Sequence, residues 1–192
     1  MSNPYDPIGT PVVGRQKRAL IITWSGFQDQ EVVYPYYRLL GAEFEVHIAA
    51  DQRDTKGRVY GILGVNMPIH LDVRAIKWTI GANECDLLVL PGGVKALEKL
   101  RQEQGVLDFI AEFYATGKTI ASTCHGAQLL ISAKVCKGHT IAAYPSIKDD
   151  IENAGATYSG EPVVVSGNII SSPHYDHMGP WMEAAIARVN GH

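Results

Sequence analysis

The sequence has few cysteines, no long apolar run and no strong excess of either charge. Its 3 Cys are an odd number, which does not suit a disulfide framework and favours a reducing compartment. No stretch approaches the roughly 18 uninterrupted apolar residues of a membrane-spanning helix, and the N-terminal segment lacks the apolar core of a signal peptide. We therefore expect a cytoplasmic protein without a membrane partner.

Charge and motif spacing exclude further classes of protein. The 17 Lys and Arg against 20 Asp and Glu give a net charge of -3, which argues against nucleic acid as a partner. The glycine-rich turn at residues 90–93 lacks the G-x-G-x-x-G spacing of a dinucleotide site. His174 and His177 flank a carboxylate, but two histidines alone are weak support for a metal site. We expect neither a cofactor nor a metal.

Length and composition favour one folded domain preceded by an arm. Residues 1–17 are rich in proline and glycine and have no periodic apolar face, so we predict an N-terminal arm that is mobile or forms an interface. With 46% hydrophobic residues and no internal repeat, residues 18–192 are predicted to form a single domain with a sizeable core.

Apolar runs and helical patterns alternate along the chain. Strands are predicted at residues 19–24, 44–50, 86–90, 119–123, 140–142, 163–165 and 168–171. Helices are predicted at residues 29–40, 97–114, 127–131, 147–154 and 180–189, with Pro35 bending or restarting the first and a break near Gly105 in the second. This alternation predicts an α/β fold with a mainly parallel sheet and a ligand site beyond the carboxyl ends of its strands.

Cys124 is the candidate nucleophile. It follows the predicted strand 119–123 and precedes the helical run 127–131, so its thiol stands on a strand-to-helix turn near the unpaired N–H groups of a helix start. Gly126 on one side and Ser122 on the other resemble the small residues of a hydrolase nucleophile elbow. This setting predicts a thiol pKa below the ordinary value of about 8.5.

The other two cysteines and the neighbouring backbone complete this interpretation. Cys85 and Cys136 have no comparable setting and are predicted to be small buried residues. The backbone N–H groups of His125 and Gly93 are candidates for an oxyanion hole, because both lie at sharp turns after predicted strands. The His125 side chain is a candidate base.

Four motifs, in a fixed order, carry a resemblance to a known family. They are residues 27–31, 90–93, 121–126 and 143–150. Together they resemble the ThiJ/PfpI superfamily, which includes the Parkinsonism-associated deglycase, and most closely its PfpI intracellular-protease branch; the similarity spans roughly residues 18–190. The resemblance implies a flavodoxin-like three-layer sandwich of the class I glutamine amidotransferase-like type. It also implies a cysteine nucleophile at the elbow and a homodimer or higher homo-oligomer.

The resemblance also implies roles for single residues. Cys124 matches the nucleophile, His125 the adjacent histidine, Glu31 the buried acid that hydrogen-bonds the sulfur, and Tyr144 a tyrosine of the pocket. A carboxyl buried beside a thiolate is expected to be protonated, because two negative charges repel in a dry pocket.

The sequence departs from the protease branch at several positions. Gln28 replaces a glutamate in the pocket, and Leu97 stands where the branch supplies an acid from a neighbouring subunit, with Glu98 one place away. A complete triad of Cys, His and acid is therefore in doubt, and classical peptidase activity with it. His174 and His177 occupy a loop that lacks histidines in many relatives. We assign Gln28, Tyr144, His174 and His177 to the substrate pocket.

These observations favour a cysteine-dependent enzyme that acts on a small carbonyl or amide substrate through a covalent Cys124 adduct. The chemistry would be that of a glyoxalase or deglycase, or that of an amidase. One alternative is a non-enzymatic redox-sensing stress protein or chaperone, in which Cys124 is oxidised to sulfinic acid. Another is a lyase that resembles isonitrile hydratase.

Overall fold

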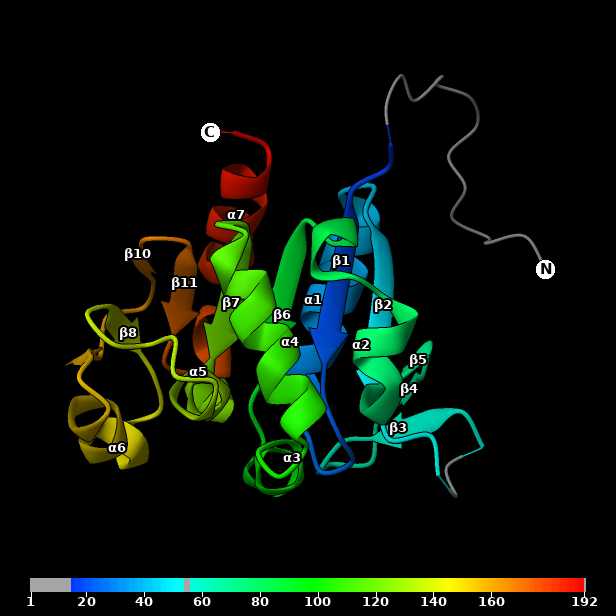
Figure 1. Cartoon of the computed structure of the whole chain (residues 1–192), viewed down its shortest axis with the longest axis horizontal. Helices are drawn as coiled ribbons and strands as arrows, with labels where there is room; N and C mark the ends of the chain where they lie inside the picture. The colour runs from blue at the N-terminus through cyan, green and yellow to red at the C-terminus, as the bar shows by residue number, and fades with distance from the viewer. Residues whose placement is uncertain (1–14, 54–55, 192) are drawn as a thin grey trace.

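The computed structural model describes residues 15–53 and 56–191 (Figure 1). The strands are β1 Arg18–Ile22, β2 Glu45–Ala50, β3 Arg58–Tyr60, β4 Asn66–Pro68, β5 Leu71–Asp72, β6 Leu87–Leu90, β7 Thr119–Thr123, β8 Thr140–Ala142, β9 Thr157–Ser159, β10 Val164–Ser166 and β11 Ile169–Ser172. The helices are α1 Asp29–Gly41, α2 Ile76–Thr79, α3 Val94–Leu100, α4 Gln104–Ala115, α5 Ala127–Ser132, α6 Lys148–Asn153 and α7 Met178–Val189.

A seven-stranded sheet forms the centre of the molecule, in the order β10-β11-β7-β6-β1-β2-β5. Every neighbouring pair is parallel except β10 and β11, which are antiparallel. All residues of β6 and β7 are buried, as expected for continuous apolar strands covered on both faces. The parallel strands point downward in Figure 1, so their carboxyl ends meet at the lower edge of the sheet.

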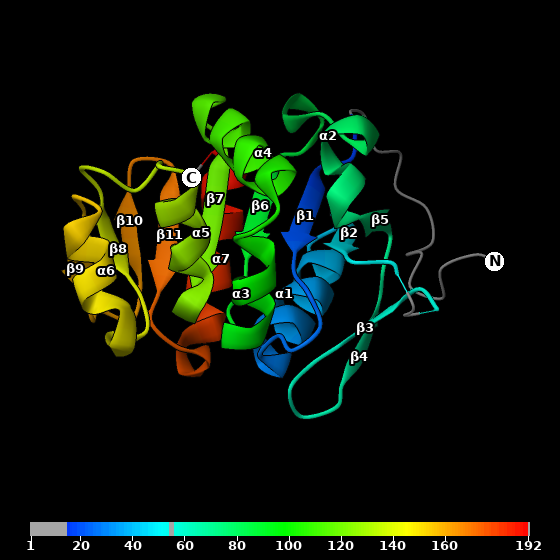
Figure 2. The ribbon, with the colours of Figure 1, turned by 60° about the horizontal axis from the view of Figure 1, so that its bottom comes forward.

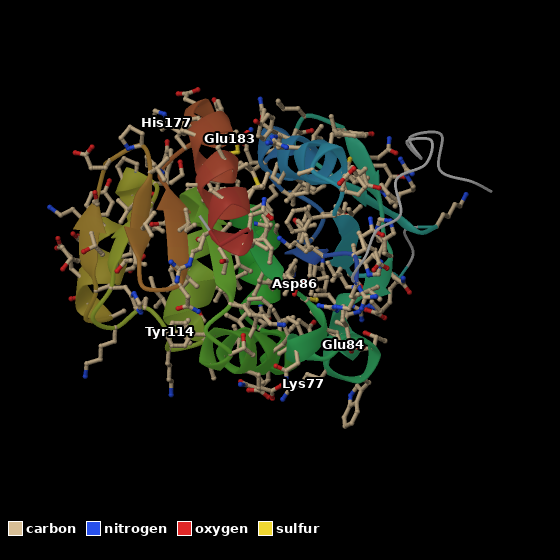
Figure 3. All side chains as sticks on the ribbon, turned by 90° about the horizontal axis from the view of Figure 1, so that it is seen from above. Lys77, Glu84, Asp86, Tyr114, His177 and Glu183 are labelled. Carbon is tan, nitrogen blue, oxygen red and sulfur yellow. The ribbon has the colours of Figure 1, made fainter. Side chains whose placement is uncertain are left out.

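Helices cover both faces of the sheet. Helices α1 and α7 pack against each other on one face, whereas α3, α4 and α5 lie on the other (Figure 3). The largest fully buried side chains include Trp181 of α7 and Phe109 and Phe113 of α4, one set for each face. The predicted three-layer α/β sandwich with a mainly parallel sheet is therefore confirmed.

Two helix predictions need correction. The segment 97–114 is two helices, because the chain leaves α3 at Arg101 and begins α4 at Gln104. Gly105, where we expected the break, lies inside the first turn of α4. Pro35 does not restart α1, which continues from Asp29 to Gly41 with the proline ring buried.

Two small sheets lie outside the central one. The hairpin of β3 and β4 is antiparallel, and β8 pairs with β9 in parallel beside α6 (Figure 2). The buried carboxylate of Asp29 accepts the N–H groups of Leu63 and Val65, at 2.9 Å and 3.0 Å, and so ties the hairpin loop to the start of α1.

Of the predicted N-terminal arm, residues 1–14 lie outside the described residues. Arg15 pairs with Asp86 at 2.9 Å, and Lys17 donates to the carbonyl of Val189 at 3.3 Å. The end of the predicted arm therefore lies along the N-terminal edge of the sheet. Within residues 15–53 and 56–191, no helix has the length and apolar character needed to cross a membrane.

Candidate active site

Cys124 occupies a strained turn at the carboxyl end of β7. Its backbone has φ 55, a left-handed conformation that costs energy for a residue with a side chain. The 3₁₀ turn Cys124–Gly126 links β7 to α5. A Cβ at Gly126 would lie 2.1 Å from the carbonyl oxygen of Leu90, so this position requires glycine. The predicted strand-turn-helix geometry is present, and Cys124 as a residue is only 7% exposed.

Glu31, Gly92 and Cys124 converge from three elements. Glu31 projects from the first turn of α1, is fully buried, and accepts the N–H of Gly92 with Oε2 at 2.6 Å. A Cβ at Gly92 would lie 2.7 Å from Glu31 Oε2, 2.9 Å from Cys124 Cβ and 3.0 Å from the backbone N of His125. The acid, the glycine turn and the cysteine are therefore in direct packing contact.

Burial dominates the ionisation of this pair. It raises the pKa of Glu31 to about 7, although the N–H of Gly92 acts in the opposite direction. Burial also raises the pKa of the Cys124 thiol, the charge of Glu31 adds to this rise, and the N–H of His125 opposes it. The sequence-based prediction of a low thiol pKa is thus wrong for the resting site. The turn buries the sulfur instead of placing it at a solvated helix start. Desolvation therefore raises the thiol pKa by more than the backbone N–H group of His125 lowers it.

The His125 ring bridges the thiol and a serine. Its Nδ1 lies 3.3 Å from Cys124 Sγ, and its Nε2 lies 3.2 Å from Ser146 Oγ. Burial lowers the pKa of His125, which favours the neutral imidazole near pH 7. With the proton on Nε2 donated to Ser146, Nδ1 is an acceptor facing the thiol. This arrangement suits a general base.

Ser146 was not singled out from the sequence. It lies 21 residues after His125, in the 3₁₀ turn Pro145–Ile147 that precedes α6. Its only sequence signal is its place within the family-like motif 143–150. The structure gives it the position that a carboxylate holds in a Cys–His–acid triad.

Aromatic rings extend from the cysteine toward a groove. The ring of His125 stacks on Tyr144 with centroids 4.9 Å apart, and Tyr144 stacks on His174 at 6.0 Å. The open groove beyond them has a volume of about 620 Å³. It is lined by Tyr144, Pro145, Ser146, Tyr158, Gly160, Pro173, His174 and Asp176. The structure thus brings Tyr144 and His174, but not His177, to this groove.

Two other residues predicted for the substrate pocket do not line this groove. The Gln28 side chain donates to Gln30 Oε1 at 2.6 Å, and only its backbone N–H reaches the glycine turn, at 3.4 Å from Gly92 O. His177 stands at the beginning of α7, where Figure 3 labels it, and its backbone N–H donates to His174 O at 3.2 Å. Both residues are close in sequence to residues of the site, but neither Gln28 nor His177 lines the groove.

The turn after β6 leads into α3, which carries Leu97 and Glu98, the residues at the place of the protease branch's intersubunit acid. Gly93 has φ 104, and a Cβ there would lie 2.6 Å from Gly26 O, so the turn closes tightly against the loop after β1. Leu97 is fully buried in the core, and Glu98 is exposed on α3. Neither residue supplies a carboxylate to His125 of the same chain. Among the described residues, no three His, Cys, Asp or Glu side chains gather as a metal site.

Comparisons with known proteins agree with this architecture. Residues 17–188 match the model of the DJ-1/PfpI family. The chain is 38% identical over 169 residues to deglycase PH1704 of Pyrococcus horikoshii, covering 88% of this chain and 97% of that protein. It is 36% identical over 169 residues to deglycase PfpI of Pyrococcus furiosus, with the same coverage of 88% and 97%.

A solved structure extends the comparison. It is a two-domain protein of Anabaena variabilis with DJ-1/ThiJ/PfpI-like and ferritin-like domains, and it superposes with a TM-score of 0.84 at 28% identity. The match covers 91% of this chain and 48% of that one. The family model spans most of the chain, and the two deglycases match over 97% of their length. The protein therefore belongs to the DJ-1/PfpI family.

Proposed function

We propose that this protein is a cysteine-dependent enzyme that acts on reactive carbonyl groups of small substrates, with the chemistry of a deglycase or glyoxalase. The observation that carries the proposal is the 3.3 Å approach of Cys124 Sγ to His125 Nδ1, in a buried turn beside Glu31. Relatives of 36–38% identity named deglycases favour a carbonyl substrate over an amide.

The first step is addition of sulfur to the carbonyl carbon. Because the resting group is a thiol, bond formation is coupled to transfer of its proton to His125 Nδ1. The S–C bond forms while the C=O π electrons move to oxygen, and the imidazolium returns the proton to that oxygen. The backbone N–H groups of His125 and Gly93 are proposed to stabilise the developing negative charge.

Glu31 supports this step in its protonated form. A neutral carboxyl donates a hydrogen bond to sulfur as negative charge develops there, whereas the ionised carboxyl repels it. Because burial raises the pKa of Glu31 to about 7, both forms are populated near neutral pH. We expect the protonated form to be the active one.

The hemithioacetal then reaches products without an external oxidant. With methylglyoxal, the carbon bound to sulfur loses its proton to a base, and the neighbouring carbonyl carbon gains one, which leaves a thioester. Water adds to the thioester, the C–S bond breaks, and the thiol recovers its proton as a hydroxy acid leaves. When methylglyoxal is carried on an amine as a hemiaminal, sulfur replaces nitrogen at that carbon: the S–C bond forms, the C–N bond breaks, and the thiol proton goes to the leaving amine. The resulting hemithioacetal then follows the same route.

The test compares Cys124→Ala with Cys136→Ala. Cys136 is also buried but lies outside the site, so it controls for loss of a buried sulfur. We expect methylglyoxal turnover in the parent protein and in Cys136→Ala and none in Cys124→Ala, with thermal unfolding showing that each variant is folded. Turnover that persists in Cys124→Ala overturns the proposal.

The same samples separate the alternatives. Turnover of small amides but not of carbonyl compounds identifies an amidase, and turnover of an isonitrile but not of carbonyl compounds identifies a hydratase. Addition of two oxygens to Cys124 under mild peroxide, without turnover of any substrate, identifies a redox sensor. Each of these results contradicts the carbonyl proposal.

A further inference from the structure

We propose that a basic pocket at the N-terminal edge of the central sheet binds a small, multiply charged anion of the phosphate type. The pocket has a volume of about 270 Å³, and the residues that line it include Lys17, Asp86, Lys118 and Arg188. It lies at the start of β7, whereas Cys124 follows the end of that strand. The inference therefore concerns a second site and goes beyond the proposed function.

The fold gathers these residues from distant parts of the sequence. Lys17 comes directly before β1, Asp86 directly before β6 and Lys118 directly before β7, and the three strands are neighbours in the sheet. Because parallel strands begin at the same edge, the residues that precede them meet there. Arg188 reaches the same pocket from the last turn of α7. Figure 3 looks onto this edge of the molecule and labels Asp86 near its middle.

Positive charge exceeds negative charge in the basic pocket. Three cations line it, against one carboxylate, that of Asp86. Arg15 donates to both oxygens of this carboxylate at 2.9 Å, and the backbone N–H of Arg18 donates to Oδ2 at 2.9 Å. Lys118 Nζ is farther away, at 3.9 Å from Oδ1. Asp86 is thus compensated mainly by Arg15, so the cations in the lining keep most of their charge on a chain whose net charge is -3.

Neutral oxygen atoms hold the two lysines of the basic pocket. Lys118 Nζ donates to two backbone carbonyls of residues 83–85, at 2.7 Å and 2.6 Å. Lys17 Nζ donates to Val189 O at 3.3 Å and to Asn190 Oδ1 at 2.5 Å, and so also offsets the partial negative charge at the end of α7. Neutral acceptors fix an ammonium group without cancelling its charge. Each ammonium keeps a third N–H with which it can bind an anion.

Arg188 supplies the open cation of the pocket. Its side chain is exposed, and no hydrogen bond or ion pair joins it to any other residue within 15–53 and 56–191. By contrast, Arg38 of α1 pairs with Glu183, another residue of α7, at 2.8 Å. A guanidinium presents its N–H groups as a planar fork that fits two oxygens of a phosphate. Arg188 is therefore placed to close on an anion that the lysines hold.

The size and charge of the basic pocket select the class of ligand. Its volume of about 270 Å³ is below the range of roughly 300–1,000 Å³ that is usual for drug-sized ligands. Its cations come from three separate elements, so an anion with several oxygens contacts more of them than a monocarboxylate does. The pocket therefore suits a phosphate group, either as a free ion or as the ester of a small molecule.

The experiment measures the binding of inorganic phosphate, pyrophosphate, glycerol phosphate and acetate to the full chain. Calorimetry in a buffer without phosphate gives each affinity, and the NMR shifts of the backbone amides of Gly117 and Thr119, which line the pocket, give the location. We expect pyrophosphate to bind about tenfold more tightly than acetate, to shift both amides, and to bind more weakly as salt rises. Tighter binding of glycerol phosphate than of inorganic phosphate identifies an ester as the ligand, and the reverse order identifies the free ion.

Arg188→Gln is the main variant, because this side chain is exposed and has no described partner to lose. We expect it to weaken pyrophosphate binding by about threefold to tenfold, and Lys118→Gln to do the same. Arg101→Gln is the matched control, since it removes an exposed guanidinium at the end of α3, outside the pocket lining. It should leave the affinity unchanged. Thermal unfolding shows whether each variant is folded.

Three results would overturn the inference: equal affinity for pyrophosphate and acetate, unchanged pyrophosphate affinity in Arg188→Gln, or amide shifts that leave out Gly117 and Thr119. The outcome is independent of the reaction at Cys124, and Cys124→Ala should keep the affinity for pyrophosphate. If carbonyl turnover fails while pyrophosphate binding depends on Arg188, the proposed function is wrong and the anion site remains. If turnover depends on Cys124 while pyrophosphate does not bind, only the anion site is wrong.

Discussion

Glu31 Oε2 accepts the backbone N–H of Gly92 at 2.6 Å, deep beneath the turn that carries Cys124. This bond connects the first turn of α1 to the loop after β6. Helix α1 follows β1, and β1 and β6 are neighbouring strands of the sheet. The bond holds Oε2 of Glu31 in place. The surrounding protein buries the Glu31 side chain completely. The fold thus fixes the position of Glu31. Its burial raises its own pKa, and its charge affects the pKa of Cys124.

The pKa of Glu31 leads to a prediction about stability. Its pKa is about 7 in the folded protein, against 4.5 for an unburied glutamate. Between these values the folded state holds a proton that the unfolded state has released, so the free energy of unfolding falls as pH rises and levels off above 7. Glu31→Gln removes this effect. Its stability relative to the parent protein should rise by about 3 kcal/mol from about pH 4 to about pH 8.

Urea unfolding at several pH values measures the difference. Glu98→Gln is the control, because Glu98 is exposed on α3 and its removal should change stability little at any pH. A constant difference between Glu31→Gln and the parent protein across this range would mean that the buried carboxyl titrates normally.

The ionisation of Cys124 leads to a second prediction. Burial and the Glu31 charge raise the pKa of this thiol, so the midpoint of its alkylation with pH should lie above about 8.5. In Glu31→Gln the repelling charge is gone, and the midpoint should move to lower pH. Peptide mapping of alkylated protein reports each cysteine separately. Cys85 serves as an internal reference, because burial raises its pKa to about 12 in the absence of a nearby Glu31.

Either of two results would contradict this account. A parent midpoint well below 8.5 would mean that the N–H groups of the turn outweigh burial, as the sequence alone suggested. An upward shift in Glu31→Gln would mean that the carboxyl stabilises the thiolate already at rest.

We expect Ser146 to act as a positioning residue for His125, and its removal gives the third prediction. In Ser146→Ala the Nε2 of His125 loses its partner at 3.2 Å, so the ring is held less firmly in the tautomer that accepts from the thiol. We expect kcat for carbonyl turnover to fall about threefold to tenfold with little change in KM. The acid limb of the pH profile, which reports His125, should shift. Ser146→Thr keeps the hydroxyl and should restore most of the rate, whereas failure of both variants alike would indicate a packing role.

The layered fold could be predicted from the sequence because its strands are local signals. Leu87–Leu90 and Thr119–Thr123 are short runs bounded by turns, and a strand buried on both faces needs only such a run. The break between α3 and α4 was misplaced for a related reason. Glycine marks a weak point in a helical pattern, but Gly105 lies in a first turn, where the helix tolerates it.

Only those features of the site that depend on local sequence could be predicted. The spacing of Cys124 and Gly126 predicts a tight turn. Ser146, the partner of His125, lies in a separate turn, and only tertiary packing brings the two together. The predicted direction of the Cys124 pKa shift was wrong for the same reason. Helix position can be read along the chain, whereas desolvation depends on what covers the sulfur. His177 shows the limit for a loop, since three residues from His174 its side chain already lies outside the groove lining.

The turn itself supplies the last prediction. Gly126→Ala would place a Cβ 2.1 Å from the carbonyl oxygen of Leu90, a backbone atom of the central strand β6 that cannot move without disturbing the sheet. We expect a loss of about 3 kcal/mol or more in the free energy of unfolding, and a large increase in the alkylation rate of Cys124 as the turn separates from β6. Gly105→Ala is the matched control, because nothing lies within 4 Å of a Cβ there. In helix α4 it should stabilise by up to about 1 kcal/mol. If Gly126→Ala were as stable as Gly105→Ala, the close packing of the elbow against β6 would be wrong, and with it the burial that sets the ionisation of Cys124.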